Sequence, residues 1–173
     1  MELERYKYQH KHVIVFKPKI DDRYSFSEVV THGGWKIPAI CVDDGADLLK
    51  HIADSEVNPK VVAVDEAFMI PGIADALIFL YRSGFDVIVS SLDLAANGKP
   101  FSEMTKMFPW ATRIEKCTAV CTTCGRDARF TYKKGTAPNE ATIEIGGAEM
   151  YEPRCARCFP LFSTDVVTSG DKR

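Results

Sequence analysis

The sequence lacks the features that mark membrane-spanning, secreted and nucleic-acid-binding proteins. No apolar run approaches the roughly 20 residues needed to cross a bilayer, and the charged N-terminus has no apolar signal-peptide core. The net charge of −2 provides no basic footprint for nucleic acid or an anionic lipid surface. No internal repeat or low-complexity tract is present either. We therefore expect a cytoplasmic protein without a membrane partner, and nucleic acid is not an expected partner.

The length and the apolar content allow a substantial core. With 173 residues, the chain suits one domain, or a main domain with a small appendage. Apolar residues make up 46% of the sequence, which is enough for such a core. The composition indicates no class of protein other than a globular one.

The stretch 61–67 combines a buried strand with two carboxylates. Four consecutive small or β-branched apolar residues predict a strand buried on both faces, as in a parallel sheet. The strand ends at Asp65 and Glu66, and open α/β sheets bind ligands at the carboxyl ends of their strands. Asp65 could hold a magnesium ion and Glu66 could accept a proton from an attacking hydroxyl, as in nucleotide-dependent phosphoryl transfer. Alternatively, the two carboxylates only cap the loop or helix that follows.

Strands and helices alternate along the first two thirds of the chain. This alternation predicts an α/β fold with an open, mostly parallel sheet. A turn is expected at residues 35–38, between the first two strands. The expected strands are residues 13–16, 39–42, 61–64 and 86–92, and the expected helices are residues 1–12, 43–58, 72–83 and 101–108. Asp43 or Asp44 is the expected N-cap of the helix at 43–58, and Pro71 is expected to open the helix that starts at Gly72.

Four of the six cysteines, Cys121, Cys124, Cys155 and Cys158, form two C-x-x-C knuckles. In a cytosolic protein such pairs indicate metal binding rather than disulfides. Together, two knuckles can complete a closed tetrahedral zinc site, which would be structural because no coordination position stays open. The spacing between the knuckles is longer than is usual for a zinc ribbon, so four unrelated buried thiols are the alternative.

The segment around the knuckles predicts a small β-ribbon appended to the α/β part. Its expected strands are residues 117–121, 130–135 and 141–145, and a frayed polar tail is expected at residues 163–173. Cys41 and Cys117 have no partner knuckle and are expected in the core.

In their order and spacing, these segments resemble the type II thymidine kinases from about residue 2 to Cys158. The matching segments are residues 16–18 (Phe-Lys-Pro), 21–24 (Asp-Asp-Arg-Tyr), 64–67 (Val-Asp-Glu-Ala), 92–93 (Leu-Asp), 98–101 (Gly-Lys-Pro-Phe), 118–121 (Thr-Ala-Val-Cys), Cys124 and 145–155 (Ile-Gly-Gly-Ala-Glu-Met-Tyr-Glu-Pro-Arg-Cys). The resemblance implies a RecA-like α/β domain at residues 1–116 with helices on both faces of its sheet, a zinc-binding lasso domain at 117–160 and a flexible tail at 161–173. It also implies a homotetramer that transfers the γ-phosphate of ATP to the 5′-hydroxyl of thymidine with magnesium.

The resemblance further implies a role for each matching residue. Asp65 would serve the magnesium ion, Glu66 would be the general base, and Arg23 would stabilise charge on the transferring phosphate. Phe101 would pack against thymine. The base pocket closed by the lasso would be lined by Tyr151, with Thr131 nearby, and by the backbone of Glu144, Ile145, Gly146 and Gly147.

Three departures from the family pattern affect the predicted function. No G-x-x-x-x-G-K-[ST] loop, which would hold the ATP phosphates, is present. Phe68 and Met69 replace a common Gln-Phe pair, and Ala96 replaces an aromatic residue. Two interpretations follow: a truncated and impaired thymidine kinase, or a degenerate relative with a structural or interaction role. A third interpretation is a zinc-ribbon module that binds nucleic acid through basic residues of the ribbon, such as Arg126 and Lys133. Charged residues in a hairpin are more simply explained by contact with solvent.

Overall fold

The structure is a computed structural model that describes residues 6, 9, 11–21, 28–30, 36–135 and 146–162. The chain divides into two compact units. Unit 1 comprises Met1–Asp93 and Phe101–Thr112, and unit 2 comprises Leu94–Pro100 and Arg113–Arg173. Most of the helix expected at residues 1–12, the strand expected at 141–145 and the tail at 163–173 lie outside the described residues.

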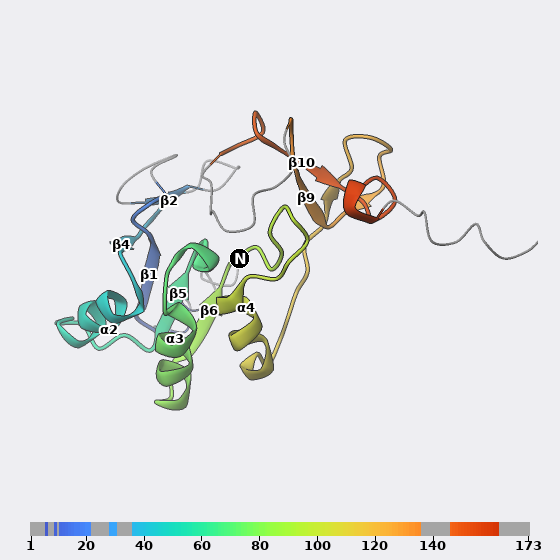
Figure 1. Cartoon of the computed structure of the whole chain (residues 1–173). Coiled ribbons are helices and arrows are strands. Elements are labelled where there is room, and N and C mark those ends of the chain that lie inside the picture. The colour runs from blue at the N-terminus through green and yellow to red at the C-terminus, as the bar shows by residue number, and fades with distance from the viewer. Residues whose placement is uncertain are drawn as a thin grey trace, which may run out of the picture. The chain divides into compact units, whose positions relative to one another are not determined.

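Unit 1 is built on a four-stranded parallel sheet in the order β4-β1-β5-β6 (Figure 1). Its strands are β1 (Val13–Pro18), β4 (Ile40–Val42), β5 (Val61–Val64) and β6 (Asp86–Val89). All four residues of β5 are buried, which confirms the prediction of a strand covered on both faces. The predicted fold class, α/β with a mostly parallel sheet, is confirmed.

The connection from β1 to β4 contains a small antiparallel pair, β2 (Glu28–Val30) with β3 (Lys36–Pro38). The predicted turn at residues 35–38 is therefore wrong for Lys36–Pro38. Ile37 pairs with Val29, so pairing with the preceding strand, rather than the local Pro and Trp pattern, decides the conformation of this segment.

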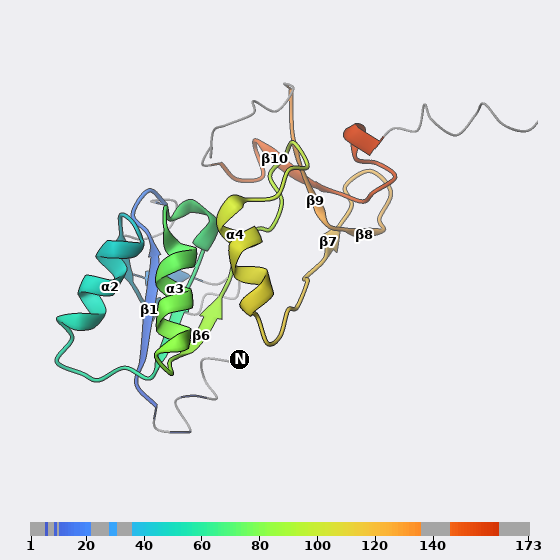
Figure 2. The same ribbon diagram turned by 60° about the horizontal axis from the view of Figure 1, so that its bottom comes forward.

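Three helices, α2 (Gly45–Ala53), α3 (Ile73–Arg82) and α4 (Ser102–Met107), lie on one face of the sheet (Figure 2). Right-handed crossovers explain this placement of α2 and α3, because β4 to β5 and β5 to β6 step in the same direction across the sheet. Short 3₁₀ turns, η1 (Ala67–Met69) and η2 (Phe108–Trp110), follow β5 and α4. The described residues thus carry helices on one of the two faces that the sequence predicts to be covered.

Helix α2 begins where the sequence predicts and ends early. Asp44 is its N-cap and accepts a hydrogen bond from the main-chain N–H of Asp47 at 2.8 Å. The predicted end at Asn58 is wrong, because the main-chain N–H of Asp54 already caps the carbonyls of Lys50 and Ile52. The chain therefore leaves the helix after Ala53.

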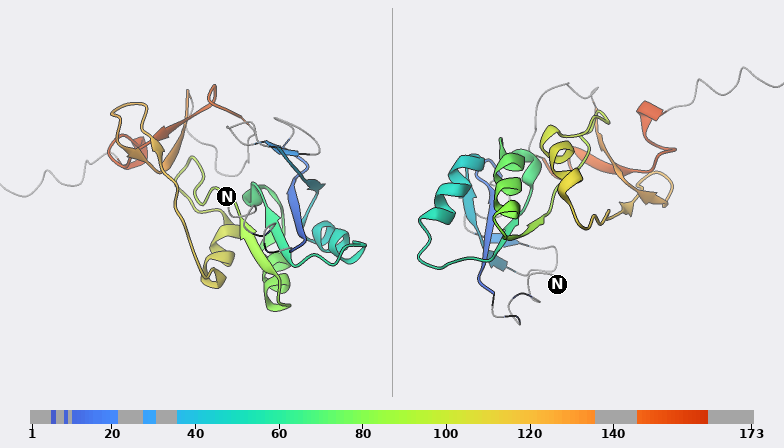
Figure 3. Two further views of the ribbon diagram at one scale, coloured as in Figure 1. Left: turned by 180° about the vertical axis from the view of Figure 1, so that it is seen from behind. Right: turned by 90° about the horizontal axis from the view of Figure 1, so that it is seen from below.

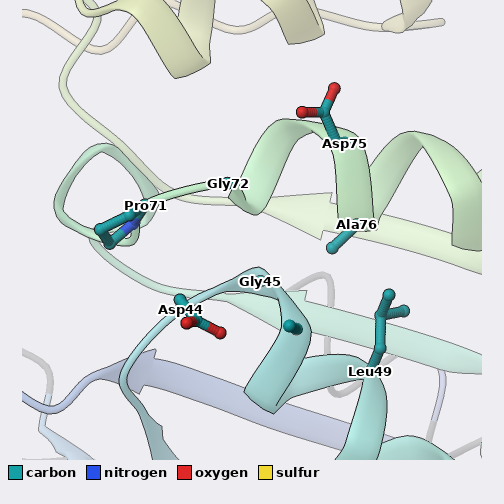
Figure 4. Close-up of a pocket in the computed structure, with 8 residues that line it drawn as sticks. Asp44, Gly45, Leu49, Pro71, Gly72, Asp75 and Ala76 are labelled. Atoms are coloured by element: carbon teal, nitrogen blue, oxygen red, sulfur yellow. The ribbon is translucent and has the colours of Figure 1, made fainter.

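Helices α2 and α3 meet where Gly45 faces Gly72 (Figure 4). The main-chain N–H of Gly45 donates to the carbonyl of Pro71 at 2.9 Å. A Cβ atom built on Gly45 would lie 2.3 Å from the carbonyl oxygen of Gly72, so a side chain at position 45 would push the helices apart. The close approach supports the core beneath, in which Phe16, Leu48 and Ile73 are fully buried.

Unit 2 contains two small antiparallel sheets, which Figure 3 shows in orange and red. Strand β7 (Ala119–Val120) pairs with β8 (Asp127–Ala128), and β9 (Phe130–Lys133) pairs with β10 (Tyr151–Arg154). A 3₁₀ turn, η3 (Pro160–Phe162), follows the last knuckle. Cys117 is exposed, so its predicted place in the core is wrong.

No helix among the described residues combines the length and the apolar character that crossing a membrane requires.

Candidate active site and metal centre

The two carboxylates predicted from the sequence lie at the carboxyl end of β5, in the middle of the sheet. The main-chain N–H of Asp65 donates to the carbonyl of Phe16 in β1 at 2.9 Å, and that of Ser90 donates to the carbonyl of Val64 at 2.8 Å. The chain is therefore tied to both neighbouring strands just before Glu66. Asp65 and Glu66 are each half-buried, and they lie at the end of the sheet where open α/β proteins bind their ligands.

Glu66 has a left-handed backbone, with φ 49° and ψ 41°. Among the described residues, it is the one non-glycine residue with positive φ. The Cβ atom disfavours this conformation, and such conformations gather at functional sites. The single 3₁₀ turn of η1 follows at once, with the N–H of Met69 donating to the carbonyl of Glu66 at 3.0 Å. The chain thus reverses sharply between Asp65 and the buried residues that follow.

Two buried charged residues lie at the same end of the sheet, one in the neighbouring strand β1 and one just after it. Lys17 of β1 is 4% exposed, and Asp21, which follows β1, is 6% exposed. The main-chain N–H of Asp21 donates to the carbonyl of Pro18 at 3.1 Å, so the chain folds back directly after the strand. Lysine and aspartate side chains are seldom this buried unless they are paired.

Phe101 lies at the start of α4 and contacts Phe68. Their ring centroids are 4.5 Å apart with an interplanar angle of 36°. The main-chain N–H of Phe101 donates to the carbonyl of Asp93 at 3.0 Å, which fixes the backbone that carries the ring. Phe68 and Met69 are each 8% exposed, so the two departures from the family pattern pack into the core of unit 1.

In unit 2, four of the residues predicted to line the base pocket lie in one hairpin. Thr131 of β9 is paired with Pro153 of β10, and Tyr151 lies two residues before Pro153. Gly147 lies just before β10, and its carbonyl accepts the main-chain N–H of Tyr151 at 3.0 Å. At Gly146 a Cβ atom would lie 2.5 Å from the sulfur of Met150, so a larger residue at this position would displace the Met150 side chain. Strand β10 was not predicted, because Pro153 argues against a strand.

Three predicted site residues, Arg23, Glu144 and Ile145, lie outside the described residues.

The four knuckle cysteines converge on one point within unit 2. Their sulfur atoms all lie within 4.8 Å of one another, and Cys124 Sγ is 3.5 Å from Cys155 Sγ. Cys121 and Cys155 are buried, while Cys124 is exposed. This geometry excludes a random set of buried thiols, and the four sulfurs could hold a metal ion such as zinc.

The surroundings of the cluster favour thiolates at two of its four cysteines, Cys121 and Cys155. Burial opposes ionisation of Cys121, but main-chain N–H groups, that of Cys155 first, outweigh it and lower the pKa. Burial also opposes ionisation of Cys155, while hydrogen bonds from Cys124 and Cys158 lower its pKa. The hydrogen bond with Cys124, followed by burial, raises the pKa of Cys158, so Cys158 holds its proton more tightly than Cys121 or Cys155. A divalent cation bound to the Cys158 sulfur would displace this proton.

Two supporting residues were missed from the sequence. The hydroxyl of Ser91 accepts the main-chain N–H of Phe68 at 3.1 Å, and Glu103 Oε2 accepts the N–H of Ala74 at the start of α3 at 2.8 Å. Neither residue belongs to a motif. The available signals were weak: a serine pair closing an apolar strand, and an acid in the first turn of a short helix.

The fold and the site define a class: an α/β protein with paired carboxylates at the end of a central parallel strand and a ribbon whose four clustered cysteines could hold a metal ion. Comparison with known proteins narrows this class. The sequence profile described as "Thymidine kinase" matches residues 1–159. The curated thymidine kinase of Onion yellows phytoplasma (strain OY-M) is 38% identical over 161 residues, which cover 90% of this chain and 76% of that protein. The chain belongs to the thymidine kinase family.

Proposed function

We propose that this chain has the active-site arrangement for transferring the γ-phosphoryl group of ATP to the 5′-hydroxyl of thymidine, giving dTMP in nucleotide salvage. Family membership supports the substrates, and one observation carries the chemistry: a half-buried Asp-Glu pair at the carboxyl end of the buried central strand β5. The alternative is a degenerate relative that keeps the fold and the metal site but performs no transfer.

In the proposed mechanism Glu66 is the general base. As the O5′ oxygen attacks the γ-phosphorus, the bond to the β,γ-bridging oxygen breaks, ADP leaves and the hydroxyl proton passes to the Glu66 carboxylate. Asp65, a half-buried carboxylate, is suited to hold magnesium, which would neutralise charge on the phosphates. Arg23 would stabilise the same charge.

The base pocket in this proposal is shared by side chains and backbone. Phe101 would pack against thymine, and Tyr151, with Thr131 nearby, would line the pocket. The backbone of Glu144, Ile145, Gly146 and Gly147 would read the edge of the pyrimidine.

We also propose zinc as the metal of the cysteine cluster, a homotetrameric assembly and a cytoplasmic location. Four sulfur ligands fit tetrahedral zinc and leave no position for substrate, so the ion would be structural. Because the sequence contains no G-x-x-x-x-G-K-[ST] motif, we expect this chain to bind ATP weakly and to be impaired in turnover. Sedimentation velocity would test the assembly.

The deciding experiment measures dTMP formed from ATP and thymidine by the full chain, together with thymidine binding by calorimetry. We expect slow formation of dTMP and a fall in turnover of about 100-fold or more in Glu66→Gln, because the general base is lost. Thymidine affinity should stay unchanged in this variant. Glu56→Gln, the same change at an exposed position, is the matched control. A folded chain that forms no dTMP would support the degenerate alternative, and full turnover in Glu66→Gln would remove Glu66 from the base role.

A further inference from the structure

We infer that Ser91 is a positioning residue for the Asp65–Glu66 pair, because its hydroxyl holds the turn that keeps Glu66 in its left-handed conformation. Ser91 lies just after β6, the strand next to β5 in the sheet. The expected effect of Ser91 on turnover rests on the proposed function. Its expected effect on the backbone conformation of Glu66 rests on geometry alone.

The turn after β5 needs external support. A left-handed backbone is disfavoured for any residue with a Cβ atom, so Glu66 would relax if its surroundings allowed it. The residues that follow, Ala67 to Ile70, are all buried. Their main-chain N–H groups are shielded from water and depend on acceptors within the protein.

The segment after β6 supplies two of these acceptors. The N–H of Ala67 donates to the carbonyl of Ser90 at 3.2 Å, and the N–H of Phe68 donates to the Ser91 hydroxyl at 3.1 Å. Any residue at position 90 could provide the first acceptor, since it is main chain. The second acceptor is a side chain, and only a residue with a short polar group can provide it from this position.

The Ser91 hydroxyl is itself oriented. It donates to the carbonyl of Leu92 at 3.1 Å, so its proton is committed and its lone pairs are free to face the N–H of Phe68. The same hydrogen bond fixes Phe68, whose ring contacts Phe101. Ser91 therefore holds two parts of the proposed site: the direction of the Glu66 carboxylate and the ring pair beside the start of α4.

Removing the hydroxyl leaves a buried N–H without its acceptor. In Ser91→Ala the turn should loosen so that the Phe68 N–H gains a water or main-chain partner, and Glu66 should populate ordinary negative φ. A displaced general base slows chemistry much more than it weakens substrate binding, because binding uses other groups.

The first test measures conformation and needs no activity. In the full-length protein, NMR couplings would report φ of Glu66, and hydrogen exchange would report protection of the Phe68 amide. For Ser91→Ala we expect loss of the left-handed coupling and exchange about fivefold faster, the effect of one lost hydrogen bond. Ser91→Thr should restore both values. Ser83→Ala, which removes an exposed hydroxyl bonded to the Phe79 carbonyl in α3, should change neither. Wild-type values in Ser91→Ala would overturn the inference.

The second test separates positioning from general stabilisation. With thymidine and ATP, Ser91→Ala should lose about tenfold in kcat because its base is misplaced, with KM for thymidine nearly unchanged, and Ser91→Thr should recover kcat. Equal kcat in Ser91→Ala and wild type would overturn the catalytic part. If the wild-type chain forms no dTMP, the proposed function fails, while the NMR comparison still decides whether Ser91 holds Glu66.

Discussion

At the scale of single residues, Gly45 shows how a missing side chain determines packing. Replacing glycine by alanine at a helix start normally favours the helix by about 0.5–1 kcal/mol. At this position the new Cβ atom would lie 2.3 Å from the Gly72 oxygen, which is main chain and cannot rotate away. Steric repulsion should therefore outweigh helix propensity.

We predict that Gly45→Ala lowers the free energy of unfolding by about 1–3 kcal/mol, the usual effect of overpacking. Urea denaturation of the variant and the wild type would measure the difference. Lys50→Ala, an exposed change in the same helix, should stay within about 0.5 kcal/mol of the wild type. A stabilised Gly45→Ala protein would show that propensity, not packing, dominates at this position.

Glu103 connects two helices through one carboxylate. It accepts the N–H of Ala74 at the start of α3, and its side chain, 13% exposed, also pairs with Lys106 at 3.4 Å. A negative charge at a helix N-terminus interacts favourably with the unpaired N–H groups there. The coulombic effect of Glu103 is also the largest cause that raises the pKa of Lys106.

We predict that Glu103→Ala lowers the free energy of unfolding by about 1–2 kcal/mol, because the N–H of Ala74 loses its acceptor. Glu103→Gln keeps an acceptor and should cost less, but it should lower the pKa of Lys106 toward the ordinary lysine value, which NMR titration would measure. The sign follows from linkage: a raised lysine pKa stabilises the fold at neutral pH, and this stabilisation is lost as the pH rises through the raised pKa. An unchanged Lys106 pKa in Glu103→Gln would contradict the pairing.

At the scale of elements, the sequence pattern correctly predicted the features that depend only on residues close together in the chain. The apolar run of β5, the Asp44 cap of α2 and the proline-glycine boundary before α3 each depend on neighbours in sequence, and each lies where predicted. Strands β3 and β10 contain prolines and form because the preceding strand pairs with each of them, a contact that their own residues do not signal.

The candidate site shows the same difference between features set by local motifs and features set by contacts between elements. The carboxylate pair and the cysteine knuckles were visible in the sequence as compact motifs. The left-handed backbone of Glu66 and the Ser91 hydroxyl that supports its turn depend on the pairing of β5 with β6, which no motif records. Supporting contacts between elements are therefore where sequence reasoning fell short.

The ribbon around the cysteines should depend on its metal. Its buried apolar side chains are few: Cys121, Ala128 and Cys155 form one cluster, and Phe159 packs on Phe130 and Phe162. We expect this small core not to hold the ribbon folded without metal. We predict about one zinc ion per chain in wild type and none in Cys155→Ser, with loss of the β9–β10 amide protection. Cys117→Ser, at an exposed cysteine outside the cluster, is the control and should keep both. Elemental analysis and hydrogen exchange would measure the two effects, and a folded, metal-free Cys155→Ser ribbon would disprove the dependence.

At the scale of the whole molecule, the two units have separate sources of stability. Unit 1 has a buried apolar core that includes Phe16, Leu48 and Ile73, while unit 2 has the sulfur cluster and an aromatic group of Phe130, Phe159 and Phe162. Metal binding contributes folding free energy only to the part that contains the ligands.

We predict two thermal transitions for the full chain, of which a chelator lowers only one. Calorimetry with and without the chelator would measure both midpoints, and circular dichroism of the helices would assign the transition that does not move to unit 1. A single transition that shifts as a whole would show that the units unfold together.

Seven residues constrain how such a protein can change in evolution. Leu94–Pro100 belongs to unit 2 but is inserted between two segments of unit 1, and Gly98 lies against Phe159 and Leu161. Unit 2 is therefore not a contiguous segment that recombination could add or remove at a single junction. A lineage that lost the catalytic chemistry but kept the ribbon would have to inherit the flanking parts of the α/β unit as well.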